Sequence, residues 1–283
     1  MNPRSFILIE PLKASKFFLL AIAAGLIAIH LNITWKLKDF DLLISSVIFW
    51  SSVCSLVYQK RHSLHLETEV ISSFLGILFL TLVLLKSTSP GLSFIYISPL
   101  ISAVGISLLA SGFKGLKQYR SELIVLFFLG VPHVTLFRLI DISEFTARFA
   151  AFVLWYLGFE VSRTGVNILL TAGGLEVYQG CSGLKNIIEL WGLAVVLLVM
   201  FPTNWLKQSL VLVMATFIGF VVNGIRVVVM GVLVASLNKT AFEYWHIGDG
   251  SLIFSMISIL IFGLFCFVML RLDEENSENQ HSV

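Results

Sequence analysis

Charged side chains are scarce in this sequence. Only 13% of its 283 residues are Asp, Glu, Lys or Arg, whereas 57% are hydrophobic. A soluble domain is about a quarter charged, and so few charges do not cover a surface that faces water. The composition therefore excludes soluble enzymes, disulfide-rich secreted domains and disordered chains. It predicts a protein that crosses the membrane several times.

Cysteine pairs, metal-binding patterns and basic clusters are also missing. The three cysteines, Cys54, Cys181 and Cys266, lie far apart, without the spacing of a zinc site or a disulfide framework. The net charge is only +2, and no basic cluster is interleaved with aromatic residues, so nucleic acid is not expected as a partner. Nothing in the sequence requires a metal or an organic cofactor, and we predict none.

Long apolar runs fill most of the chain. About 20 apolar residues cross the bilayer core as a helix, and eight segments are predicted as spans, so residues 1–272 form a single all-α polytopic domain embedded in the lipid bilayer. The acidic, polar tail 273–283 is predicted to be disordered. The eight segments are 17–34, 42–58, 70–85, 92–111, 122–140, 186–206, 208–236 and 250–270.

The stretch between the fifth and sixth spans is predicted to lie outside the bilayer core. Residues 142–158 read as an amphipathic helix lying at the membrane interface. Two short β-type runs then flank Ala172-Gly173-Gly174, which predicts a hairpin ahead of Cys181. Basic residues in the loops 59–62 and 112–121 favour cytoplasmic termini. The interfacial helix and the hairpin then face outward.

Cys181 stands in Gly180-Cys181-Ser182-Gly183, immediately before a helix predicted to begin near Leu184. The positive end of a helix dipole favours a thiolate, and Lys185, one turn on, adds to that effect. The flanking glycines let a substrate backbone approach. The alternative is a tight turn with a small buried thiol.

Arg226 lies inside the span 208–236, in the sequence Asn223-Gly-Ile-Arg226. An arginine within a span costs about 3 kcal/mol on insertion scales, so it is expected to face a cavity or a partner. The alternative is that its side chain reaches the headgroups. Glu189 is the nearest carboxylate by depth, and a structural ion pair between the two is the main alternative to a functional role for Glu189.

His246 precedes the last span and is predicted to lie in a loop. Histidine exchanges protons near neutral pH, although a single loop histidine is often incidental. Together with Cys181 and Arg226 it completes the parts needed for acyl transfer. The thiolate attacks a peptide carbonyl, the histidine protonates the leaving amine, and the arginine stabilises the oxyanion.

These motifs, in this order and spacing, resemble the exosortase/archaeosortase family, and among its branches the cyanoexosortases. The specific resemblance covers 122–270. It implies a membrane cysteine transpeptidase with Cys181 as nucleophile, Arg226 as oxyanion stabiliser and His246 as proton donor or base. Asn223 then positions Arg226 or binds substrate.

The resemblance also implies a partner and a location. Such enzymes process membrane-anchored proteins that carry a C-terminal sorting signal, in which a motif such as Pro-Glu-Pro precedes a transmembrane helix and a basic cluster. The expected location is the inner membrane of a prokaryote, with the active site facing outward. Water, an amine and an envelope component all remain open as acyl acceptors.

Two other classes of protein compete with this interpretation. A transporter would line its pathway with Glu189 and Arg226, although the sequence has no inverted repeat with broken helices. A structural membrane component would use the same pair to hold two helices together. Loss of the Cys181 thiol distinguishes both from a cysteine enzyme.

Overall fold

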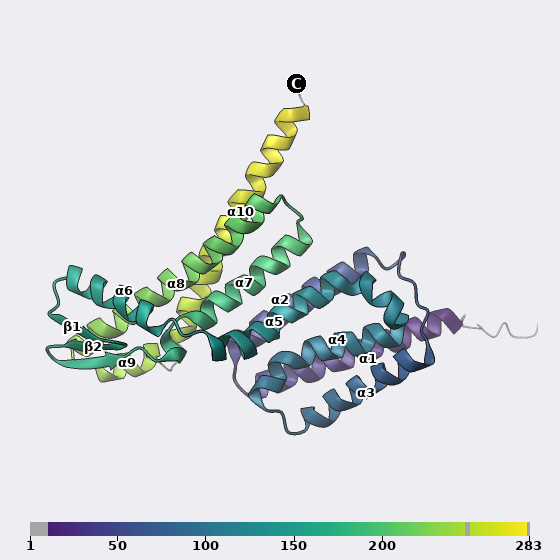
Figure 1. The fold of residues 1–283 in the computed structure, drawn as a ribbon, viewed down its shortest axis with the longest axis horizontal. Coiled ribbons are helices and arrows are strands. Elements are labelled where there is room, and N and C mark those ends of the chain that lie inside the picture. The colour runs from purple at the N-terminus through teal and green to yellow at the C-terminus, as the bar shows by residue number, and fades with distance from the viewer. Residues whose placement is uncertain (1–10, 247–249, 282–283) are drawn as a thin grey trace, which may run out of the picture. The chain divides into compact units, whose positions relative to one another are not determined.

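A computed structural model describes residues 11–246 and 250–281 of the chain. These residues form two compact units, Met1–Val131 and Pro132–Val283. The boundary between the units falls inside a helix, α5. Each unit has its own packing, and Figure 1 labels the α-helices of both units together with β1 and β2.

The first unit is built from helices joined by short loops. Close packing of α3 on α4 depends on two glycines that face each other, since a Cβ on Gly76 would lie 2.8 Å from the carbonyl oxygen of Gly105. Small residues allow such close approach in membrane helices. The elements are α1 (Pro11–Lys36), α2 (Phe40–Gln59), α3 (Val70–Ser87), α4 (Leu92–Gly115), the 3₁₀ helix η1 (Leu116–Tyr119) and α5 (Arg120–Leu139).

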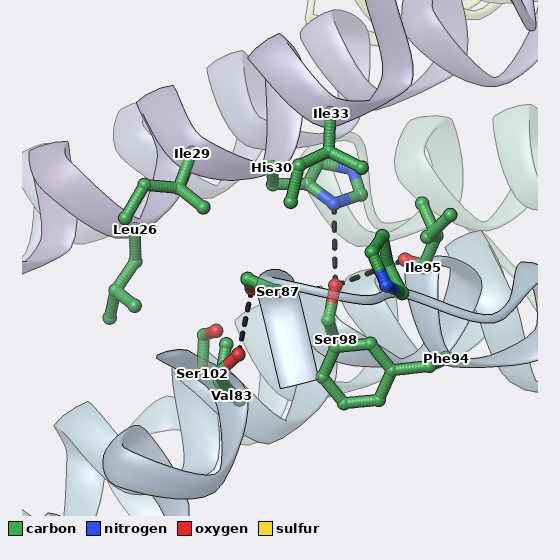
Figure 2. A pocket seen from close by; sticks show the side chains of 11 residues that line it. Leu26, Ile29, His30, Ile33, Val83, Ser87, Phe94, Ile95, Ser98 and Ser102 are labelled. Carbon is green, nitrogen blue, oxygen red and sulfur yellow. Dashed lines mark hydrogen bonds between the residues drawn. The ribbon is translucent and has the colours of Figure 1, made fainter. Parts of the chain in front are cut away.

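A buried polar group ties three of these helices together. His30 of α1 contacts the hydroxyl of Ser46 on α2 at 2.9 Å through Nε2, and that of Ser98 on α4 at 3.4 Å through Nδ1. Figure 2 shows His30 and Ser98 beside a small cavity of about 10 Å³. Both ring nitrogens therefore have partners inside the unit, as expected for a structural histidine.

The second unit combines helices with a small sheet. Its helices are α6 (Ser143–Tyr156), the 3₁₀ helix η2 (Gln179–Cys181), α7 (Leu184–Met200), α8 (Trp205–Ala235), α9 (Lys239–His246) and α10 (Gly250–His281). Its strands are β1 (Val161–Thr164), β2 (Asn167–Leu170) and β3 (Gly173–Glu176). The strands pair antiparallel in the order β1-β2-β3, and the sheet packs against α6 and α8.

The all-α membrane fold predicted from the sequence is confirmed, with a different number of spans. All eight predicted segments are helical, but six stretches of the described residues are long and apolar enough to cross a membrane. Leu92–Leu139 counts as one stretch of 48 residues because α4, η1 and α5 follow without a break. α7, with 17 residues, is one residue shorter than the shortest of these stretches, Val70–Ser87.

Three boundaries differ from the sequence prediction. The segment 186–206 ends as a helix at Met200, because Pro202 does not continue it and Asn204 caps the next helix through Lys207 N. His246 ends a short helix instead of lying in a loop, and the Asn238 side chain accepts from Ala241 N at the start of that helix. α10 extends as far as His281 and so includes 273–281 of the predicted tail, whereas 282 and 283 lie outside the described residues.

The region before Cys181 follows the prediction more closely. The interfacial helix predicted at 142–158 is α6, and the predicted hairpin is formed by β2 and β3. Gly173 and Gly174 lie inside β3, so the turn is made by Thr171 and Ala172. The third strand, β1, was not expected, because its four residues are short and mostly polar.

Candidate active site

Two helices, α8 and α6, hold the turn that contains Cys181. The Asn223 amide on α8 donates to the Cys181 carbonyl at 2.8 Å, and the Thr146 hydroxyl on α6 donates to the Ser182 carbonyl at 2.6 Å. Inside the turn, Cys181 N donates to the Tyr178 carbonyl at 2.8 Å. The Ser182 hydroxyl donates to the Gln179 carbonyl at 2.8 Å. The main chain around Cys181 is therefore fixed from both sides just before α7 begins.

The two glycines beside Cys181 each have a packing partner. Gly183 adopts a φ of 91°, which favours glycine, and a Cβ there would lie 2.8 Å from Asn223 Nδ2. A side chain at this position would displace the amide that holds the Cys181 carbonyl. At Gly180 a Cβ would lie 2.5 Å from the Tyr178 ring. Close packing at both positions thus explains why glycine is found there, in addition to the access for a substrate that the sequence suggested.

The thiol of Cys181 faces the imidazole of His246. Cys181 Sγ lies 3.4 Å from His246 Nε2, although the two residues are 65 positions apart in the sequence. Cys181 is buried, with 3% of its surface exposed, whereas His246 is half-buried at the end of α9. Tyr178 and Phe242 pack on the imidazole with ring centroids at 6.0 and 5.1 Å. This contact supplies a thiol with a group that can take its proton.

Arg226 joins the same cluster through the main chain of His246. Its Nη2 donates to the His246 carbonyl at 2.8 Å, at the C-terminal end of α9. Its Nε is buried and has no hydrogen-bond partner among the described residues. A buried N–H without a partner costs free energy, so this donor is available to a group that enters the site. The predicted residues Cys181, His246, Arg226 and Asn223 thus come together around one turn.

Charge and burial shift two titratable groups of the site. Burial, and then the positive charge of Arg226, lower the pKa of His246 below its usual value of 6.5. The imidazole is therefore neutral at neutral pH. The hydrogen bond with the Cys181 thiol, followed by burial, raises the pKa of the Tyr178 hydroxyl. Tyr178 therefore keeps its proton and presents an O–H next to the sulfur.

Lys185 and Glu189 lie one turn apart on α7. Lys185 Nζ is 3.8 Å from Glu189 Oε1, and the Glu189 side chain is largely buried. This ion pair differs from the one considered in the sequence, in which Arg226 was the nearest partner for Glu189. Because Arg226 donates a hydrogen bond to the His246 carbonyl, the structure associates the arginine with the thiol and imidazole.

Three contributors to the site were not singled out in the sequence. Tyr178 contacts both Gly180 and His246, Phe242 packs on the imidazole, and Thr146 holds the Ser182 carbonyl. Of these residues, Tyr178 could have been predicted from its spacing, because a residue three positions before a nucleophile lies close to it in a helical turn. The other two come from distant segments and depend on packing.

Metal ligands do not gather at this site. No group of three or more His, Cys, Asp or Glu side chains within the described residues is placed to hold a metal ion. The polar atoms around Cys181 are instead a thiol, an imidazole, a guanidinium, an amide and hydroxyls. This set matches acyl transfer by a cysteine, in which the protein supplies its own nucleophile and proton acceptor.

The fold and the cluster describe a multi-pass membrane protein with a cysteine and a histidine in contact. The model of the transmembrane exosortase family matches residues 40–263 of the chain. This match covers most of the sequence and includes α2, α3 and α4, which precede residue 122. The chain belongs to the transmembrane exosortase family, and membership supports a general role as a membrane transpeptidase. No curated protein and no solved structure gives a significant match.

Proposed function

We propose that this protein is a cysteine transpeptidase that cleaves a C-terminal sorting signal of the Pro-Glu-Pro type from membrane-anchored proteins. One observation carries the proposal, the 3.4 Å contact between Cys181 Sγ and His246 Nε2 beside Arg226. A thiol, a neutral imidazole and a fixed cation are the groups that thioester chemistry uses. The family match supports the same class of reaction.

The first step forms an acyl-enzyme. His246 Nε2 accepts the thiol proton, and Cys181 Sγ attacks the carbonyl carbon of the scissile peptide. The tetrahedral intermediate collapses when its C–N bond breaks, and the leaving amine takes the proton from His246. The products are a thioester on Cys181 and the released anchor segment. Because burial and Arg226 keep His246 neutral, it starts the reaction in its accepting form.

The second step resolves the thioester. An incoming amine or water gives a proton to His246 Nε2 as it attacks the thioester carbonyl. The C–S bond then breaks, and the sulfur regains the proton. An amine acceptor produces transfer to a new partner, whereas water produces hydrolysis. Both routes restore the resting thiol and imidazole.

Arg226 serves two purposes in this scheme. Its Nη2 bond to the His246 carbonyl holds the end of α9, and therefore the imidazole, against the thiol. Its buried Nε is the donor proposed for the oxyanion of the tetrahedral intermediates. Asn223 acts one helical turn earlier on α8 by holding the Cys181 carbonyl. Ser182, Gly180 and Gly183 maintain the turn.

The proposed reaction takes place at a membrane surface. Sheet edges are not stable in hydrocarbon, so the sheet that precedes Cys181 lies outside the bilayer core. In a prokaryotic inner membrane with both termini cytoplasmic, the site faces outward. The substrate's anchor helix then lies in the same membrane, and its outer juxtamembrane peptide reaches Cys181.

The experiment is co-expression with a membrane-anchored reporter that carries a Pro-Glu-Pro-type signal. Cleavage is followed by the change in reporter size for the wild type and for Cys181→Ala, with Cys266→Ala as the matched control. Cys266 is a buried cysteine of α10, which packs in the core cluster with α7 and α8. We expect processing to disappear only in Cys181→Ala. Processing that survives in this variant would exclude Cys181 as the nucleophile.

A further inference from the structure

The last strand before the nucleophile lies at an exposed edge of the sheet. β3 pairs with β2 on one side only, and Gly173, Gly174 and Glu176 are all exposed. Leu175 packs inward against the buried cluster of the second unit. Five residues after Glu176 the chain reaches Cys181. The free edge of β3 therefore runs directly into the turn that holds the thiol.

The main-chain groups on this edge can be assigned from the register. Val177 N donates to the Val166 carbonyl at 3.0 Å, which continues the pairing of Leu175 with Ile168. N–H and C=O groups alternate in direction along a strand. The main-chain N–H and C=O groups of Val177 and Leu175 thus point toward β2. Those of Gly174 and Glu176 point away from the sheet. Among the described residues, no backbone hydrogen bond reaches these two from outside the sheet.

The opposite edge of the sheet is arranged differently. β1 follows α6 and packs against it. Arg163 of β1 is 3.7 Å from Glu144 of α6, so a charged pair occupies this side. β1 is also separated from β3 by β2, at about 4.8 Å per strand. Of the two edges, β3 is the one that is continuous with Cys181.

We infer that the free edge of β3 binds the main chain of the substrate as an added strand and delivers its scissile carbonyl to Cys181 Sγ. The occupant is the extended peptide immediately outside the membrane anchor of the substrate. The inference rests on the proposed function, which requires a peptide main chain to lie against the thiol. An extended peptide adds to an exposed sheet edge through main-chain hydrogen bonds.

Two features of β3 suit this occupant. Gly173 and Gly174 are both exposed, and the positions of their missing Cβ atoms lie next to Val234 and Leu169 of the same unit. The edge also lacks the lysines, prolines and bulges that protect ordinary edge strands from pairing. Main-chain binding places few demands on substrate side chains. One enzyme is therefore able to accept many proteins that share an extended segment at this position.

The proposed signal fits one register of this strand. Proline lacks an N–H, and two prolines that flank one glutamate direct both missing donors to the same side of an extended peptide. When the glutamate faces β3, it exchanges main-chain hydrogen bonds with the edge while the prolines face away. This arrangement is the one in which strands tolerate proline. It also prevents a further strand from adding on the outer side.

A first test removes one main-chain donor from the edge. Glu176→Pro deletes the outward N–H, and Glu176→Ala keeps it while it removes the carboxylate. Val161→Pro is the matched control, because Val161 lies on the outer edge of β1. We expect reporter processing to fall at least about tenfold for Glu176→Pro, to fall less for Glu176→Ala, which keeps the main-chain donor, and to stay within about threefold of the wild type for Val161→Pro. Equal loss in Val161→Pro, or none in Glu176→Pro, would overturn the inference.

A second test needs neither catalysis nor a proline. Glu176→Cys is placed in a background of Cys54→Ser and Cys181→Ala, and single cysteines are scanned through the reporter's juxtamembrane peptide. Added strands bring same-face residues together, so disulfides should form at every second reporter position. Val161→Cys in the same background serves as control and should trap no reporter.

The two tests separate the inference from the function on which it rests. Processing by the wild type without trapping at Glu176→Cys would leave the transpeptidase in place and overturn the β3 edge as its binding surface. Alternating trapping without wild-type processing would support the edge and overturn the proposed function. Absence of both would overturn both.

Discussion

Each unit of the chain holds a histidine in contact with hydroxyl or thiol groups, and the two sites differ in what those groups can do. His30 has a serine hydroxyl on each ring nitrogen, within a cavity of about 10 Å³. His246 has the Cys181 thiol on Nε2, and the cation of Arg226 is bound to its own carbonyl. A thiol gives up its proton to an imidazole more readily than a serine hydroxyl does.

A histidine becomes a candidate for catalysis through the chemistry of its neighbours. Around His30 the two serine hydroxyls pair with both ring nitrogens, so these side chains hold helices together. Beside His246, Arg226 Nε has no partner among the described residues. Trp50 Nε1 in the first unit is also buried without a partner, so an unpaired donor alone does not indicate function. Arg226 Nε differs because it belongs to a cation that lies in one cluster with a thiol and an imidazole.

The largest expected effect separates the two histidines directly. His246→Ala removes the proton acceptor, and we expect reporter processing to fall by about 10²–10⁴-fold. Initial rates in membranes, normalised to the amount of enzyme, measure this change. Phe242→Leu, which alters packing on the imidazole without removing it, is the matched control. A similar loss in both variants would mean that packing of α9, and not proton transfer, is responsible.

Much of the fold was predictable because membrane spans are long and apolar. Each predicted span became a helix, and the interfacial segment became α6. The predicted helix boundaries were wrong where one or two residues end a helix, as at Pro202 and Asn204 between α7 and α8. β1 was missed because a strand of four mixed residues has no periodicity that stands out. Its place depends on pairing with β2.

The candidate site was predictable in its reactive residues and not in its supports. Cys181 and Arg226 can be picked out from the sequence because reactive or charged groups are rare in an apolar membrane chain and are costly to bury there. The Asn223 bond to the Cys181 carbonyl and the Thr146 bond to Ser182 depend on how α8 and α6 pack around the turn. No spacing in the sequence encodes these contacts.

Arg226 allows the charge and the hydrogen bond at His246 to be separated. Arg226→Lys keeps the charge, whereas Arg226→Gln keeps a donor and loses the charge. We expect both to lower the reporter's kcat/KM by about 10–10³-fold, because the oxyanion donor is lost. The two losses are measured side by side with the same reporter. A wild-type rate in either variant would show that Arg226 does not stabilise the oxyanion.

The same pair of variants separates the effect of the Arg226 charge on the pH dependence. The pKa of His246 is lowered by burial and by the Arg226 charge, so kcat/KM should decline only as the pH falls below the usual 6.5. Loss of the positive charge lets the pKa rise. The acid limb should therefore move to higher pH in Arg226→Gln and stay in place in Arg226→Lys. An acid limb at the same pH in all three enzymes would show that the Arg226 charge does not change the pKa of His246.

Tyr178 is expected to have a smaller effect. The Cys181 thiol raises the pKa of the Tyr178 hydroxyl, and the Tyr178 ring packs on Gly180 and His246. Tyr178→Phe keeps the ring and removes the O–H. Processing should fall by about 3–30-fold, as expected for loss of one hydrogen bond near the reacting atoms. Tyr178→Ala, which also removes the ring, should be worse. Equal rates for Tyr178→Phe and the wild type would show that Tyr178 contributes through packing and not through its hydroxyl.

The smallest effect on activity is expected at His30. His30→Ala removes a side chain that bonds to Ser46 and Ser98, so it should lower stability by about 1–2 kcal/mol and leave processing per folded molecule unchanged. Thermal unfolding in detergent measures the loss. A double-mutant cycle with Ser46→Ala then isolates the contact, because the two losses should not add if they belong to the same hydrogen bond. A folded His30→Ala protein without activity would contradict the distinction between the two histidines, because a satisfied imidazole would then be needed for the reaction.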